Sequence, residues 1–391
     1  MEHLHILIVH NRYQLAGGED TVAENEENLL KRYGHHVYHY YRENSEILKM
    51  NVFQRALAGL NSFFSIKTYK EIRKMIADYQ IEIVHVHNTV PLVSCSVYYA
   101  AKASKCAIVQ SIHNLRMICP SGTMVRNNKI CKECLRKGLY CAIKHKCYRG
   151  SRAQSAILAA SIAFHRWIRT YKKVDAYLVT TKFNYELLNK VVPKEKIFLK
   201  PYYSDSQPRD RESKKREYYI FVSRLEYLKG IYIALEAFSH LPDQKLIVLG
   251  TGPEEDKARA YVEERKLSNI EFLGFKGKKE MLDLMYHAKA LVFPTQWFEG
   301  FPMTIVESLA VGTPVIGSDI GNVGTIVRNH VNGLTFHYNS SRDLINKILF
   351  FEKNPEEARR MEEEAQNDFI KTHTPENVYE RTTEIYNSIR K

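Results

Sequence analysis

Two carboxylates, Glu299 and Glu307, are the residues of this chain best placed to do chemistry. A loop with glycine, aromatic and proline residues follows Glu299, and Glu307 falls about one turn into the apolar helix expected next. The first backbone N–H groups of a helix lack partners inside it and attract anions such as phosphate. Carboxylates nearby can accept hydrogen bonds from sugar hydroxyls. The pattern predicts a site for a phosphorylated sugar, although acidic residues also favour the first turn of any helix.

Two cations upstream extend this pattern. Arg224 and Lys229 lie between a predicted strand, 218–222, and a predicted helix, 231–238. A guanidinium fork and an ammonium group on one strand-to-helix loop can converge on a diphosphate. Taken alone, the same two residues are equally compatible with solvated cations on a surface loop.

Together these segments resemble the nucleotide-sugar half of glycosyltransferase family 4, whose members are retaining enzymes with the GT-B fold. The resemblance is most specific over 218–327 and covers nearly the whole chain. It implies an α/β protein of GT-B architecture, in which two Rossmann-like domains face a central cleft. The motifs that carry it, in the family's order, are Arg224…Lys229-Gly230, Gly250-Thr251-Gly252-Pro253 and Glu299…Glu307.

The resemblance implies transfer of a sugar from a nucleoside-diphosphate sugar, with retention of configuration, by a metal-independent hexosyltransferase. Charge growing on the departing diphosphate must be neutralised, and the sequence has no Asp-x-Asp pair to hold a metal. Uridine is the commonest base in similar enzymes, so UDP is the expected carrier. The predicted catalytic residues are His113, Arg224, Lys229 and Glu299.

A wider set is predicted to bind the donor. Glu299 is assigned to the donor sugar and Glu307 to the ribose, while His113 would touch the donor sugar or its phosphate. The alternatives are that Gly17-Gly18 forms a turn without a ligand, and that His113 satisfies the end of the strand predicted over 107–112. The chain departs from the family over 320–327, which puts contacts there in doubt. The donor-binding residues predicted are Gly17, Gly18, Ser223, Arg224, Lys229, Gly252, Phe275, Lys276, Glu299, Gly300, Phe301, Pro302, Met303, Thr304 and Glu307.

Length and patterning predict two domains. At 391 residues the chain is long for one hydrophobic core, and short apolar runs alternate with amphipathic stretches as in a parallel α/β sheet. We expect an acceptor domain over 1–202, a polar linker over 203–217, a nucleotide-sugar domain over 218–370 and a final helix over 371–391 that crosses back to the first domain. Strands are expected at 4–9, 36–40, 81–86, 107–112, 176–180, 218–222, 245–249, 270–273, 290–293 and 314–316.

Cysteines form a separate signal in a predicted insert over 119–147. Five of the seven fall there, and a Cys-x2-Cys with further cysteines nearby suits tetrahedral zinc. Reduced thiols without a ligand are the alternative. A subset of the same family has a similar insert, which implies a structural zinc site rather than a catalytic one, with Cys141 as the spare. The ligands implied by that likeness are Cys119, Cys131, Cys134 and Cys147.

Positive charge points to the acceptor. The formal net charge is +13, and 141–174 contains no Asp or Glu but many Lys and Arg beside apolar residues. Six of these apolar residues are spaced to share one broad helical face: Ile157, Leu158, Ile162, Phe164, Trp167 and Ile168. A second basic, aromatic stretch runs over 52–76. Such helices suit an anionic membrane interface, or else they are core helices with solvated outer faces.

We therefore expect a cytoplasmic enzyme, peripheral on the inner face of the membrane, that extends a polyprenyl-diphosphate-linked glycan in polysaccharide biosynthesis. The chain lacks a signal peptide and any apolar run of about 20 residues. Nucleic acid is not an expected partner, because the cysteine spacing lacks paired histidines. The alternatives are a GT-B epimerase or hydrolase, and a non-catalytic, basic, zinc-bearing binding protein.

Overall fold

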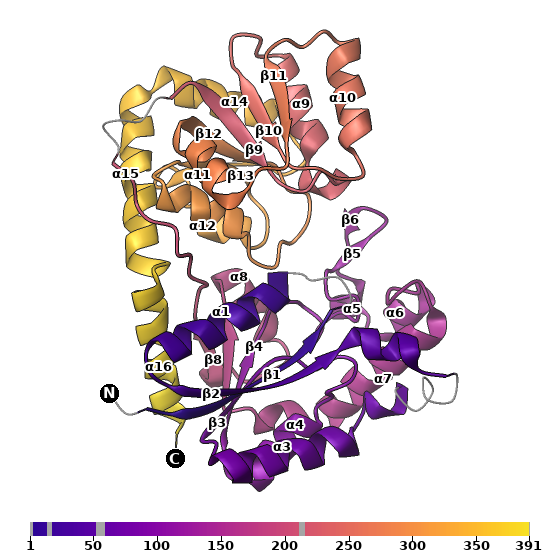
Figure 1. The fold of residues 1–391 in the computed structure, drawn as a ribbon. Helices are drawn as coiled ribbons and strands as arrows, with labels where there is room; N and C mark the ends of the chain where they lie inside the picture. The colour runs from indigo at the N-terminus through magenta and orange to yellow at the C-terminus, as the bar shows by residue number, and fades with distance from the viewer. Residues whose placement is uncertain (1–2, 14–17, 52–58, 211–215, 391) are drawn as a thin grey trace. The chain divides into compact units, whose positions relative to one another are not determined.

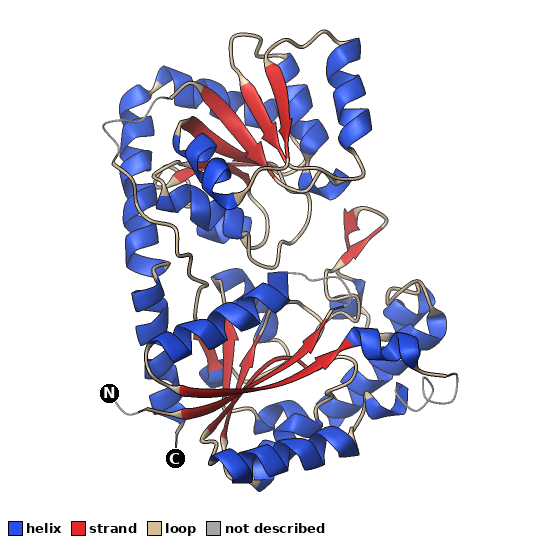
Figure 2. Ribbon diagram, in the orientation of Figure 1, coloured by secondary structure: helices blue, strands red, loops and turns tan. Residues whose placement is uncertain are grey.

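The computed structural model describes residues 3–13, 18–51, 59–210 and 216–390. The chain divides into two compact units (Figure 1). The first unit comprises 1–124, 131–200 and 379–391, and the second comprises 125–130 and 201–378. Each unit is a parallel sheet of six strands with helices on both faces (Figure 2). Since strands covered on both faces must be apolar throughout, the unbroken apolar runs of the sequence fit this arrangement.

The sheet of the first unit has the order β2-β1-β3-β4-β7-β8. Its strands are β1 (His5–Arg12), β2 (His36–Glu43), β3 (Ile83–Asn88), β4 (Ala107–Ser111), β7 (Ala176–Val179) and β8 (Ile197–Leu199). The helices are α1 (Gly18–Arg32), α3 (Ile66–Tyr79), α4 (Ser96–Ala103), α5 (Glu133–Arg136), α6 (Tyr140–Lys144), α7 (Arg152–Trp167) and α8 (Lys182–Leu188), with the 3₁₀ turns η1 (Asn44–Lys49), η2 (Thr170–Lys173) and η3 (Lys194–Lys196). From β1 the chain adds β2 on one side and β3 on the other, so the strand order reverses between β1 and β3. At such a reversal an open parallel sheet leaves a crevice at its carboxyl edge.

The second unit repeats this plan with the order β11-β10-β9-β12-β13-β14, so the strand order reverses between β9 and β12. The strands are β9 (Tyr218–Val222), β10 (Leu246–Leu249), β11 (Ile270–Gly274), β12 (Ala288–Phe293), β13 (Val315–Ser318) and β14 (Gly333–Phe336). The helices are η4 (Tyr227–Lys229), α9 (Ile231–Ser239), α10 (Glu255–Glu264), α11 (Lys278–Tyr286), α12 (Met303–Ala310), α13 (Val323–Ile326), α14 (Ser341–Lys353) and α15 (Pro355–Thr372). A two-stranded antiparallel hairpin, β5 (Val125–Arg126) and β6 (Lys129–Ile130), belongs to this unit by its contacts.

The α/β prediction is confirmed, and every expected strand is present. The strands that the sequence did not predict are β5, β6, β8 and β14, which have two to four residues each and too little apolar pattern to stand out. Part of the predicted linker is not a solvated tether. Tyr203, Ser204 and Ser206 are buried, and the Ser204 N–H donates to the carbonyl oxygen of His373 at 3.0 Å.

The last helix, α16 (Pro375–Ile389), anchors its C-terminal part in the first unit. The Tyr379 ring stacks on Tyr33 with ring centroids 3.7 Å apart. The Tyr386 hydroxyl is 2.6 Å from Nδ1 of His85, and both side chains are fully buried. Burial lowers the pKa of His85 well below its ordinary value, so the ring is neutral, and its two nitrogens are hydrogen-bonded to Tyr386 and Ser111.

The mutation Tyr386→Phe should therefore destabilise the protein by about 1–3 kcal/mol, because it leaves a buried nitrogen of His85 without its partner. Urea unfolding of the wild type and the variant measures the change. Tyr140→Phe is the matched control, since the Tyr140 side chain is exposed. Equal losses in both variants would contradict the assignment.

Candidate active site

The predicted donor residues gather where β9 and β12 separate in the second unit. The loop after β9 carries Lys229, and the loop after β12 carries Glu299. Gly230, between η4 and α9, has φ +81°, and a Cβ on it would lie 1.8 Å from the carbonyl oxygen of Pro294. Only glycine allows the two loops to approach this closely. The N–H of Gln296 also donates to the carbonyl oxygen of Leu228 at 2.8 Å.

Glu299 lies at the centre of this site and is 8 % exposed. Its Oε1 accepts hydrogen bonds from Lys229 Nζ at 2.9 Å, Thr295 Oγ1 at 2.9 Å and Trp297 Nε1 at 2.7 Å. Its Oε2 faces the same Lys229 Nζ at 2.9 Å. A carboxylate oxygen accepts more than one hydrogen bond, so Oε2 keeps capacity for a hydroxyl donor. The carboxylate is thereby oriented before any ligand arrives.

Three residues of this site were not among the sequence predictions. Thr295 and Trp297 orient the Glu299 carboxylate, and Asn322 holds the backbone beside it. Asn322 Nδ2 donates to the carbonyl oxygen of Glu299 at 2.7 Å and also to that of Gly300. The segment 320–327 departs from the family pattern, yet its asparagine secures the loop. The only hint of Asn322 in the sequence was that it lies within the segment 320–327, where the chain departs from the family pattern.

Glu307 lies one turn into α12, as the sequence predicted. Its Oε1 is 3.5 Å from Lys278 Nζ, at the start of α11. Burial raises the pKa of Glu307 above its ordinary value, while Lys278 partly opposes the shift. Pro302 precedes α12, and no side chain caps this helix. The helix start therefore presents backbone N–H groups next to the loop that carries Glu299.

The other predicted donor residues are placed less closely. Arg224 is well exposed and pairs with Glu226 at 3.1 Å. Lys276 pairs with Glu280 at 2.6 Å, and the neighbouring Phe275 is 77 % exposed. Ser223 and Gly252 flank the loop after β9, where a Cβ on Gly252 would lie 2.4 Å from the carbonyl oxygen of Leu225. Phe301 packs edge-on against Tyr202, with ring centroids 4.9 Å apart.

His113 follows β4 in the first unit and is buried. Its Nε2 lies 2.9 Å from Nδ1 of His87, and the two rings stack with centroids 5.0 Å apart. Burial lowers the pKa of His113 to about 4, so the ring is neutral at pH 7. Gly18 begins α1, whereas Gly17 lies outside the described residues.

The cysteines converge in part. The Cys134 thiol forms a hydrogen bond with Cys119, which lowers the pKa of Cys119. Cys141 and Cys147 lie within electrostatic range of Cys134. Across the described ranges, no three His, Cys, Asp or Glu side chains are placed to hold a metal ion. The side chains as placed therefore do not form the predicted zinc site, and zinc binding stays a prediction.

Comparison with known proteins bears on the second unit. Residues 204–368 match the sequence model of the family "Glycosyl transferases group 1". These residues therefore resemble a glycosyltransferase group 1 domain. An uncharacterized glycosyltransferase of Methanocaldococcus jannaschii is 32% identical over 170 residues, which are 44% of this chain and 48% of that protein. The O-antigen chain mannosyltransferase C of Escherichia coli is 26% identical over 183 residues, 46% and 48% of the two chains. The chain thus spans about half the length of these curated relatives.

Solved structures share the fold over the whole chain. A glycosyltransferase from Rickettsia africae superposes with a TM-score of 0.71 and 17% identity, covering 100% of this chain and 99% of that one. HepE of Anabaena, solved in complex with UDP, superposes with a TM-score of 0.70 and 15% identity, covering 98% of this chain and 100% of that one. The two six-stranded parallel sheets are those of a GT-B glycosyltransferase, so the group 1 domain is the second of two Rossmann-like domains.

The raised pKa of Glu307 predicts how stability depends on pH. Its folded pKa lies above the unfolded value, so the folded state binds the proton more readily, and stability falls as pH rises through the folded pKa. Without ligand, Glu307→Gln should therefore raise the free energy of unfolding at pH 7 by up to about 1 kcal/mol. The gain should vanish towards pH 4. Urea unfolding across this pH range measures it, with Glu271→Gln, an exposed carboxylate, as control. A large loss of stability at pH 7 would contradict the prediction.

Proposed function

We propose that this protein transfers a sugar from a nucleoside-diphosphate sugar, UDP foremost, to a glycan acceptor, with retention of configuration. The observation that carries the proposal is the oriented Glu299 carboxylate, paired with Lys229 beside the start of α12, inside a glycosyltransferase group 1 domain. The neighbour HepE was solved with UDP, which favours uridine among the bases. We further propose a hexosyl donor and catalysis without a metal.

Glu299 and Lys229 have complementary roles in this proposal. Oε2 of Glu299, which contacts Lys229 Nζ, accepts a hydrogen bond from a hydroxyl of the donor sugar. The ammonium group of Lys229 offers three donors, and it engages both Glu299 oxygens at 2.9 Å. Lys229 can also meet a donor phosphate and stabilise the charge that develops as the nucleoside diphosphate leaves. The pair therefore connects recognition of the sugar to departure of the leaving group.

The rest of the domain supplies the nucleotide contacts. The N-terminus of α12 offers backbone N–H groups and a helix dipole to the diphosphate. The Glu307 carboxylate, one turn further on, accepts hydrogen bonds from ribose hydroxyls. Arg224 is exposed and pairs with Glu226 rather than with Glu299. Because Glu226 is also at the surface, the guanidinium of Arg224 can turn towards a phosphate.

We also propose a lipid-linked acceptor and attachment to an anionic membrane surface. The segments around α7 and residues 59–66 pack side by side in the first unit, with Ser161 Oγ donating to the carbonyl oxygen of Ser62 at 3.0 Å. Their outward apolar side chains form an exposed apolar patch. The patch consists of Leu60, Phe64, Ile66, Ile157, Phe164, Trp167 and Ile168.

The structure corrects the face expected for α7. The sequence analysis placed six apolar residues on one broad face, but Leu158 and Ile162 are buried while Ile157, Phe164 and Trp167 are exposed. The helix turns by about 100° per residue, so these two groups point to different sides. Basic residues border the patch, and Lys173 Nζ lies 4.8 Å from the centroid of the Tyr99 ring. Aromatic side chains edged by cations suit an anionic bilayer surface. No described helix is both long and apolar enough to span a membrane.

Donor binding is the first test. UDP should raise the melting temperature of the wild type by mass action, and Lys229→Met or Glu299→Gln should weaken binding of the UDP-sugar at least about tenfold. Lys245→Met and Glu271→Gln are matched controls, because that pair is exposed and lies 2.9 Å apart at the opposite edge of the same sheet. Product formation that requires an acceptor separates transfer from epimerisation or hydrolysis. Full binding of the UDP-sugar in both site variants would reject the proposal.

Membrane attachment has its own test. Trp167, which is 79 % exposed, should insert into vesicles that contain anionic lipid. Trp167→Glu should lower the bound fraction in flotation by roughly tenfold, since an apolar anchor is replaced by a charge of the wrong sign. Tyr227→Glu, an exposed aromatic of the second unit, is the control. Failure of the wild type to float at low salt would favour a soluble acceptor.

Zinc is tested by metal analysis of purified protein. If the cysteine group binds zinc, about one ion per chain should be present, and Cys134→Ser should lose it because this thiol lies among Cys119, Cys141 and Cys147. Cys106→Ser, a buried thiol elsewhere, is the control. Less than about a tenth of an equivalent in the wild type would reject the prediction.

A further inference from the structure

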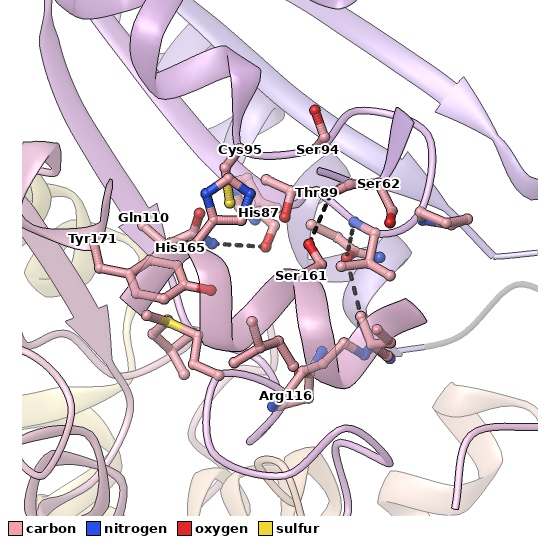
Figure 3. A pocket seen from close by; sticks show the side chains of 18 of the residues that line it. Ser62, His87, Thr89, Ser94, Cys95, Gln110, Arg116, Ser161, His165 and Tyr171 are labelled. Atoms are coloured by element: carbon pink, nitrogen blue, oxygen red, sulfur yellow. Dashed lines mark hydrogen bonds between the residues drawn. The ribbon is translucent and has the colours of Figure 1, made fainter. Parts of the chain in front are cut away.

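The first unit contains a pocket at the carboxyl edge of its sheet, beyond β3 and β4 (Figure 3). The pocket encloses about 80 Å³, several times the space that one buried water needs. Its lining includes the polar residues His87, Asn88, His113 and Arg116 together with the apolar residues Leu158 and Ile162 of α7. In the view of Figure 3, Arg116 lies across the pocket from Ser94 and Cys95. A cation and apolar side chains therefore line the same pocket.

The guanidinium of Arg116 is incompletely satisfied. It makes only long contacts, 3.4 and 3.5 Å to the hydroxyl of Tyr13 and 3.5 Å to Oδ1 of Asn88. Its Nε is buried without a hydrogen-bond partner among the described residues. A buried N–H of a charged group that lacks an acceptor costs about 1–3 kcal/mol or more. A planar guanidinium fork is suited to bind two oxygens of a phosphate or carboxylate at once.

The imidazole of His87 supplies a second donor. Burial lowers the pKa values of His87 and His113, so both rings are neutral at pH 7. If Nε2 of His113 carries its proton, it donates to Nδ1 of His87 across the 2.9 Å contact. His87 then bears its own proton on Nε2, which is buried and has no partner in the described part of the chain. With this tautomer, the pocket has two buried N–H groups, on Arg116 and His87, that lack an acceptor in the described part of the chain.

Glu19 and Glu26 are the carboxylates that act on His113, and Glu19 also acts on Arg116. The oxygens of Glu19 already accept from the hydroxyl of Tyr13 at 2.8 Å and from Nδ2 of Asn114 at 2.8 Å. Glu19 reduces the net positive charge near the pocket but does not pair directly with the guanidinium, which is left to bind an external oxyanion.

We propose that this pocket binds a phosphate group of the acceptor, held by Arg116 and His87. That the phosphate belongs to the acceptor rests on the proposed function, because the pocket by itself indicates only an oxyanion of phosphate size. Leu158 and Ile162 also line the pocket, which suits a phosphate attached to a lipid or another apolar group.

The first experiment uses inorganic phosphate and the full-length protein, with no donor present. Nuclear magnetic resonance follows the ring nitrogens of His87 and His113 while phosphate is added. Phosphate should shift these resonances and raise the apparent pKa values of both rings. Arg116→Gln should weaken phosphate binding at least tenfold, and Arg116→Lys should weaken it less, because lysine keeps the charge but loses the fork. Arg152→Gln is the control, since it removes one positive charge from an exposed position on α7.

The outcomes decide the inference. Saturable shifts of His87 and His113 that are lost in Arg116→Gln support it. Unshifted rings in the wild type overturn it, and this measurement holds even if Arg116→Gln fails to fold. Displacement of phosphate by UDP would assign the pocket to the donor and would also overturn the acceptor proposal.

A transfer assay separates this inference from the proposed function. Acceptors with and without a phosphate are compared in the wild type, in Arg116→Lys and in Arg152→Gln. A rise in KM of about tenfold in Arg116→Lys, seen only with the phosphorylated acceptor, supports the site. Transfer with equal KM in all three proteins overturns the inference and leaves the proposed function standing. Phosphate binding without any sugar transfer would instead reject the proposed function and keep the phosphate site.

Discussion

All six strands in each sheet run in the same direction, and the chemistry of the protein depends on that constraint. Parallel strands joined by helices deliver every strand-to-helix loop to one edge. Where the chain adds strands on both sides of a starting strand, the loops diverge and leave room for a ligand. This happens between β9 and β12 in the second unit and between β1 and β3 in the first. The Lys229–Glu299 pair occupies the position in the second unit, and in the first unit the His87–His113 pair lies at the carboxyl ends of β3 and β4, next to the other position.

The two positions use polar groups in different ways. In the second unit an ion pair is only partly buried, and three hydrogen bonds to one oxygen of Glu299 orient the carboxylate. In the first unit, burial holds the imidazoles of His85, His87 and His113 neutral, so Arg116 carries the positive charge of the pocket. An oriented carboxylate suits hydroxyl groups, whereas an unsatisfied guanidinium suits an oxyanion.

Helix α7 connects the interior of the first unit with its surface. Ser161 and His165 face the pocket and hold the backbone of Ser62 and Phe63, while Phe164 and Trp167 are exposed. Burial of one side in the core stabilises the helix, and this leaves its other side able to carry apolar residues that folding does not require.

The sequence by itself determined the strands, the helix after Glu299 and the residue types of the donor site, because apolar period and turn residues are local properties. It did not reveal that Lys229 contacts Glu299, 70 positions away, or that Thr295, Trp297 and Asn322 orient the carboxylate and its loop. It also placed the apolar residues of α7 on one face, where the structure has two. Only the tertiary structure decided these points, because strand order and helix packing set which distant side chains meet, and neither is encoded in a local pattern.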